Sequence, residues 1–228
     1  MVWFLLLAHF LADYPLQTNW IVRNKKRFGV LLLHVAIHLA AMLVIVGRSA
    51  GRLWPYLLAL AAAHLLIDAA KNKVNALRPQ WVAGPYIIDQ LCHYLTIFLT
   101  ARWIAQDQVP LDLPFSPALA VYLMAYLVVT YTCYISEWLL TNSTPRYQQQ
   151  VVEQAWPRML VRALLLTFLL AGGGLLRPVL TAAPALPLLA LTLLLPYGES
   201  STRVRAILTD LTVSTAAAIL VLAVTWTA

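Results

Sequence analysis

Charged side chains are scarce in this sequence. They make up 11% of its 228 residues, against about 25% in a typical soluble domain. Hydrophobic residues account for 61% and are spread along the whole chain. So few charges cannot cover a water-facing surface, which excludes an ordinary soluble domain, with or without a single anchor. We expect an all-α protein, a polytopic transmembrane helical bundle that forms one membrane domain over residues 1–228.

Cysteine and N-terminal charge are also nearly absent. The two cysteines, Cys92 and Cys133, lie in apolar segments, which favours packing roles over a disulfide. The N-terminus lacks the basic stretch of a secretory signal, and its apolar run contains His9 and Asp13. We therefore expect this run to be retained as a short first helix. The net charge of +7 comes from basic residues between apolar segments, where they indicate topology and not nucleic-acid binding.

Apolar segments recur at lengths near the roughly 20 residues that a membrane helix needs. We predict eight segments, with seven as the main alternative. Residues 1–105 form a half that carries histidine and aspartate on four helices, and residues 106–228 form apolar C-terminal helices. The expected segments are 2–14, 29–47, 53–70, 85–105, 116–140, 158–176, 183–197 and 206–227.

The loops between these segments differ in charge. Basic residues gather in the first, third, fifth and seventh loops, so we expect these loops in the cytoplasm and both termini outside. Arg48 and Arg52 in the second loop do not fit this arrangement. The basic residues of the first loop, Arg23, Lys25, Lys26 and Arg27, are expected to anchor the inner surface.

All five histidines fall within the first 93 residues, and each is four residues from another histidine or an aspartate. Residues four apart share a helix face, about 5–6 Å apart at Cβ, and can chelate one metal ion. Random placement predicts about 0.5 such pairs. The pairs are His9 with Asp13, His34 with His38, His64 with Asp68, and Asp89 with His93.

The predicted topology brings all four pairs to a similar depth on the cytoplasmic side. Metal sites in the core of helical bundles are built from polar side chains that several helices present at the same depth. Lys71 shares the face of His64 and Asp68, and Gln17 and Gln90 are candidate supporting donors. A second set of polar residues, Glu137, Arg158 and Arg162, is as compatible with packing as with function.

The strings HFLADYPLQTNWI, LLHVAIHL, HLLIDAAK and IDQLCHYL resemble those of a bacterial family of integral membrane proteins, the domain of unknown function 3307, over about residues 3–105. The resemblance implies a location in the bacterial inner (plasma) membrane and implies no established activity. The family's polar positions fall on His9, Asp13, Gln17, Lys25, His34, His38, His64, Asp68, Lys71, Asp89, Gln90 and His93. The spacing is also similar to that of membrane-bound metal-dependent hydrolases, as a pattern only.

From these residues we predict a membrane enzyme that holds one or two divalent ions of the Zn, Fe or Mn type. Its substrate would be a membrane lipid or an isoprenoid phosphate, and Asp68, Asp89 and Lys71 would carry the chemistry. Two alternatives stay open: a transporter of metal ions or protons, and a non-catalytic scaffold with a structural polar cluster. The predicted ligands are His9, Asp13, His34, His38, His64, Asp68, Asp89 and His93.

Overall fold

A computed structural model describes residues 1–228 except 82, 142, 176–199 and 227–228. The described residues are almost entirely helical and contain no strand, which confirms the predicted all-α class. Contacts divide the chain into two compact units, Met1–Ala120 and Val121–Ala228. The predicted boundary between the two halves, at residue 105, lies 15 residues before the end of the first unit at Ala120.

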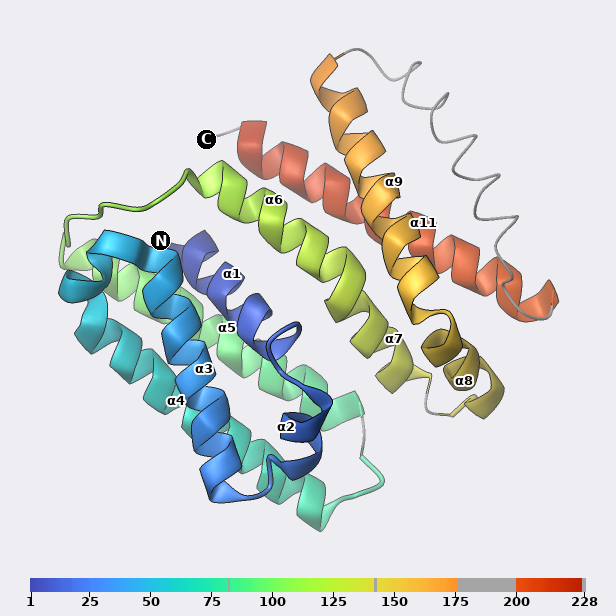
Figure 1. Cartoon of the computed structure of the whole chain (residues 1–228), viewed down its shortest axis with the longest axis horizontal. Coiled ribbons are helices and arrows are strands. Elements are labelled where there is room, and N and C mark those ends of the chain that lie inside the picture. The colour runs from blue at the N-terminus through green and yellow to red at the C-terminus, as the bar shows by residue number, and fades with distance from the viewer. Residues whose placement is uncertain (82, 142, 176–199, 227–228) are drawn as a thin grey trace. The chain divides into compact units, whose positions relative to one another are not determined.

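The first unit is an up-and-down four-helix bundle. Helix α1 packs on α3, α3 on α4, α4 on α5, and α5 on α1, so the four close into a ring (Figure 1). A short helix, α2, lies between α1 and α3. The helices span Val2–Asp13 (α1), Asn19–Asn24 (α2), Phe28–Val46 (α3), Ala50–Leu77 (α4) and Ala83–Gln106 (α5), with a 3-10 turn, η1, at Gly47–Ser49.

Local chemistry sets the ends of these helices. Helix α1 ends at Asp13 before Pro15, because proline cannot continue a helix. With 12 residues, α1 is about 18 Å long, shorter than the roughly 30 Å apolar core of a membrane. Thr18 caps α2 by accepting a hydrogen bond from the Ile21 amide. Gly47 ends α3 in a left-handed conformation, at φ 56°, which glycine adopts without strain.

The end of the bundle that carries the η1 turn is closed by the loop after α5. The Ser49 hydroxyl accepts a hydrogen bond from the Asp112 amide at 2.7 Å. Arg48 lies 3.8 Å from the Asp112 carboxylate, and Arg52 donates to the Pro110 carbonyl at 3.3 Å. Both arginines of the predicted second loop therefore contact the loop after α5 at this end of the bundle.

The second unit contains the remaining described helices. Helix α9 packs on α11, and both contact η2, a π-helical turn that joins α6 to α7. Helix α8 packs on α7 and, through Tyr147 and Val151, on Ala206 and Ile207 of α11. The elements are α6 (Pro117–Leu127), η2 (Val128–Thr132), α7 (Cys133–Leu140), α8 (Pro145–Glu153), α9 (Ala155–Leu175) and α11 (Ser200–Trp226).

Seven of the eight predicted segments correspond to these helices. The remaining segment, 183–197, lies outside the described residues. Within the described ranges, three helical runs are long and apolar enough to cross a membrane: Phe28–Leu77, Pro117–Leu140 and Thr202–Thr225. The first run is the hairpin of α3 and α4. The short helices α2 and α8 were not predicted, because neither is long or apolar enough to stand out in the sequence.

Candidate metal centre

The four histidine and aspartate pairs meet inside the first unit. Each lies on a different helix of the ring: α1, α3, α4 and α5. All five imidazoles and the carboxylates of Asp68 and Asp89 are at most 4% exposed, and the side chain of Asp13 is 9% exposed. The prediction that the four pairs share one buried polar cluster is confirmed.

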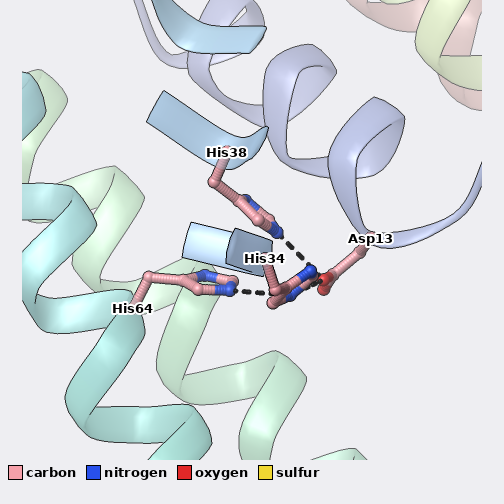
Figure 2. A group of neighbouring side chains, drawn as sticks. All are labelled: Asp13, His34, His38 and His64. Atoms are coloured by element: carbon pink, nitrogen blue, oxygen red, sulfur yellow. Dashed lines mark hydrogen bonds and ion pairs between the residues drawn. The ribbon is translucent and has the colours of Figure 1, made fainter. Parts of the chain in front are cut away.

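One group of four donors surrounds the Asp13 carboxylate. Asp13 Oδ1 lies 3.2 Å from His34 Nε2 and 3.1 Å from His38 Nε2. His64 Nε2 lies 3.3 Å from His34 Nε2. Figure 2 shows these side chains converging from three helices. One donor atom from each of Asp13, His34, His38 and His64 lies within 4.8 Å of all the others.

These separations match those of a metal-binding set. Zinc–nitrogen bonds of about 2.0–2.1 Å in a tetrahedron place neighbouring ligand atoms about 3.3 Å apart. Three of the six separations in the group around Asp13 are 3.1, 3.2 and 3.3 Å, and all six are within 4.8 Å. Three imidazoles and one carboxylate are also a donor set that suits Zn, Fe or Mn.

A second group of three donors shares His64 with the first. It comprises His64, Asp68 and His93, again within 4.8 Å of one another. His64 Nε2 is 3.5 Å from Asp68 Oδ2, and His93 Nε2 is 3.9 Å from Asp68 Oδ1. The remaining predicted ligands, His9 and Asp89, contact these groups without belonging to either. His9 lies 3.4 Å from Asp13, and Asp89 lies 3.4 Å from His93.

Two lysines reach into the cluster and pair with its carboxylates. Lys25 Nζ lies 2.8 Å from Asp68 Oδ2. Lys71 Nζ bridges Asp68 Oδ1 at 3.0 Å and Asp89 Oδ2 at 2.6 Å. Lys25 is only 8% exposed. Lys25 therefore does not anchor the membrane surface, as was predicted for the basic residues of the first loop. In the sequence, only its place among the family's polar positions indicated a role in the cluster.

Two glutamines tie these groups together. The Gln90 amide donates to Asp13 Oδ2 at 3.2 Å and to Asp89 Oδ2 at 3.3 Å. Gln17, oriented with its oxygen toward the donors, accepts from Lys25 Nζ at 3.0 Å and lies 3.2 Å from the His34 ring. Both were predicted as supporting donors. Such contacts fix the orientation of ligand side chains.

The charges of the cluster do not balance. Three carboxylates (Asp13, Asp68, Asp89) face two ammonium groups (Lys25, Lys71), so with neutral imidazoles the formal sum is −3 + 2 = −1. A buried negative charge is costly. Protonation of one imidazole would balance it, and a divalent cation would change the formal sum to −1 + 2 = +1.

A small cavity adjoins the imidazoles on the side away from the lysines. His9, His38, His64 and His93 form its polar wall, and its apolar wall consists of Leu5, Met42, Leu60, Thr96 and Ile97. Its volume of about 10 Å³ is close to the space that one water molecule requires. Beyond it the bundle core is apolar and includes Val46, Leu53, Leu57, Ala101 and Ile104.

A separate buried ion-pair network lies in the second unit. Arg158 pairs with Glu137 at 2.9 Å and with Asp210 at 2.7 Å, and Arg162 contacts the same two carboxylates at 2.6 Å each. Tyr147, in the short helix α8, donates to Glu137 at 2.5 Å. Burial and this acceptor raise the pKa of Tyr147 to about 12, so its hydroxyl stays protonated at neutral pH.

Asp210 is the charged residue of this network that could not be identified from the sequence. It has no ionisable residue four positions away, and its partners lie about fifty residues earlier in the chain. With two arginines and two carboxylates the network is neutral, so its charges are compensated within the protein. A network of this kind joins α7, α9 and α11 through charge-assisted hydrogen bonds.

These observations define a class: an all-helical protein with membrane-type helices and a buried His/Asp cluster that could hold a metal ion. Residues 1–123 match the family described as "Protein of unknown function (DUF3307)", which covers the whole cluster, and the chain belongs to this family. The resemblance predicted from the four motifs is thereby confirmed. No curated protein and no solved structure matches the chain.

Proposed function

We propose that the cluster binds a divalent metal ion between Asp13, His34, His38 and His64. The observation that carries this proposal is the spacing of four buried donors from three helices at ligand-to-ligand distances. The excess of three carboxylates over two ammonium groups is compatible with a cation at this position. Of the Zn, Fe and Mn candidates, zinc agrees best with a set of three imidazoles and one carboxylate.

The second donor group is the weaker position for an ion. Its only carboxylate, Asp68, already pairs with both lysines. A second ion beside two ammonium groups would meet electrostatic repulsion. We therefore assign the resident ion to the group around Asp13, and a second ion would require the lysines to leave Asp68.

We further propose that the protein is a hydrolase of a lipid or isoprenoid phosphate. The metal would supply Lewis-acid activation of a water molecule and of a phosphoryl oxygen. Lys25 and Lys71 bind the phosphoryl oxygens as point charges. Asp68 and Asp89 hold the two ammonium groups in place, and His93, which lines the small cavity, takes the proton from the attacking water.

A membrane-bound substrate agrees with the surroundings of the cluster. Helix α1 ends at Asp13, so the chain turns at the depth of the cluster, and α2 follows with Trp20 and Val22 exposed. Arg23, Lys26 and Arg27 are exposed beside them. Aromatic and basic residues together are typical of the interface of the membrane with the cytoplasm. We therefore propose the inner membrane, with the cluster near its cytoplasmic side.

The apolar core beyond the cavity counts against transport. A transport path needs polar groups across the full membrane depth. In the described part of the first unit, the interior between the cavity and the η1 turn is filled by aliphatic side chains such as Leu53, Leu57 and Ile104. Flux of Zn²⁺ or protons into liposomes containing the purified protein would nevertheless favour the transporter alternative over the hydrolase.

The test is phosphate release by the purified, full-length protein. The protein is stripped with a chelator, reloaded with Zn²⁺, Mn²⁺ or Fe²⁺, and incubated with phosphatidic acid, prenyl monophosphates and prenyl diphosphates in mixed micelles. We expect one metal to restore hydrolysis, and Lys71→Met to lower kcat/KM about 100-fold or more, the scale of a lost charge contact in the transition state. Lys73→Met, two residues along α4 and exposed, should retain activity. No release with any metal would contradict the hydrolase assignment.

A further inference from the structure

A second, open cleft lies within the second unit, where α8 and α11 begin. It has a volume of about 580 Å³ and is lined by Thr144, Pro145, Arg146, Tyr147, Thr202 and Arg205. This volume is within the usual range of small-molecule sites, about 300–1,000 Å³. Its two charged lining residues, Arg146 and Arg205, are both exposed and both basic.

Among the described residues, no carboxylate pairs with either arginine of the cleft. Neither forms an ion pair with any residue in the described ranges, unlike Arg158 and Arg162 in the same unit. The guanidinium of Arg205 lies 4.5 Å above the centre of the Tyr147 ring. Stacking covers one face of a guanidinium and leaves its N–H edge free to bind an oxyanion in two-point fashion.

The stacked tyrosine is held rigidly from below. Tyr147 is 3% exposed, and its hydroxyl donates to Glu137 in the buried ion-pair network. Its ring also packs with Val151 against Ala206 and Ile207 of α11. Arg205 therefore lies on an ordered platform, which lowers the entropy lost when a ligand is bound.

Exposed apolar side chains flank Arg205 on α11, and others lie further along α8 and on α9. Val152, Trp156 and Leu160 are exposed along the end of α8 and the start of α9. Val204 and Leu208 flank Arg205 on α11 and are exposed as well. Two arginines beside an exposed aromatic and aliphatic surface suit a ligand with an anionic head and an apolar tail, because a free anion would gain nothing from the apolar surface.

We propose that this cleft is a binding site for the phosphate head group of an anionic phospholipid. The arginines bind the phosphate oxygens, and the exposed apolar residues of α9 and α11 contact the acyl chains. Basic pockets between membrane helices on the cytoplasmic side bind such head groups. The proposal uses only residues of the second unit, so it is independent of the metal centre and of the proposed hydrolase activity.

The experiment measures lipid selectivity of the full-length protein. The protein is placed in nanodiscs of phosphatidylcholine containing one fifth phosphatidylglycerol or cardiolipin, and the retained lipids are quantified by native mass spectrometry. We expect enrichment of the anionic lipid over phosphatidylcholine. Arg146→Gln and Arg205→Gln should each weaken it about fivefold, since one basic residue near anionic lipid contributes on that scale. Arg102→Gln, an exposed arginine on α5, is the control with the same change in charge.

Other outcomes would overturn the proposal. Equal retention of anionic and neutral lipids by the wild type would do so, as would equal loss of selectivity in Arg102→Gln. Inorganic phosphate is the second probe: binding of free phosphate as tight as that of the lipid would identify a soluble ligand. Because Arg205 stacks on Tyr147 and its loss can weaken folding, the Arg146→Gln result decides when Arg205→Gln lowers the unfolding temperature.

Discussion

Lys25 Nζ lies 2.8 Å from the Asp68 carboxylate, which joins the segment after α2 to the middle of the metal centre. The same carboxylate is 3.4 Å from His34 and 3.0 Å from Lys71. Asp68 is therefore held by two cations next to the imidazoles. This arrangement separates the residues proposed to bind the metal from those proposed to bind the phosphoryl group.

Loss of the Lys25 charge should destabilise the fold. Lys25→Met leaves Asp68 with one ammonium partner inside the bundle, and breaking a buried ion pair costs about 3–5 kcal/mol. We expect an effect near the lower end, because Lys71 remains. Reversible unfolding in mixed micelles measures it. Lys25→Met combined with Asp68→Asn should recover part of the loss, and a Lys25→Met protein as stable as the wild type would refute the buried pair.

The neutral network of the second unit gives a similar prediction with an independent control. Asp210→Asn leaves Arg158 and Arg162 with Glu137 as their only carboxylate, so we expect a loss of about 3–5 kcal/mol. Glu153→Gln removes an exposed carboxylate in α8 that only contacts Gln149, and should change stability by less than about 0.5 kcal/mol. Equal effects of the two substitutions would mean that the network carries no special stability.

Two glycines at the turn between α3 and α4 offer a matched pair. Gly47 has φ 56°, and an added Cβ would lie 3.3 Å from Pro114 Cδ, whereas a Cβ on Gly51 meets nothing within 4 Å. Gly47→Ala should cost about 1–2 kcal/mol because alanine is strained at positive φ. Gly51→Ala, in the helix α4, should be neutral or stabilising by up to about 1 kcal/mol. Thermal unfolding of both variants compares them, and the reverse order would contradict this turn.

Hydrophobic segments and helical spacing were sufficient to predict the four long helices of the first unit and the convergence of the four pairs. His34, His38, His64 and Asp68 could be found because a metal site imposes spacing of four along a helix. The pairing of Lys25 with Asp68 and the role of Asp210 could not be found by spacing, because their partners are distant in sequence and only tertiary packing brings them together. Asp13 contacts imidazoles of α3 as well as His9 on its own helix. These contacts with α3 also depend on how the helices pack.

The metal content of the purified protein tests the central claim most directly. Each variant is dialysed with a trace of Zn²⁺, Mn²⁺ and Fe²⁺, and bound metal is measured by mass spectrometry with inductively coupled plasma. The wild type should hold about one ion per chain, and His38→Ala and His64→Ala should hold less than about a tenth, since each removes one donor of a four-donor set. His9→Ala removes an equally buried imidazole that belongs to neither donor group, so it should keep the ion. A wild type without stoichiometric metal, or a His9→Ala protein that loses as much metal as His64→Ala, would contradict the account.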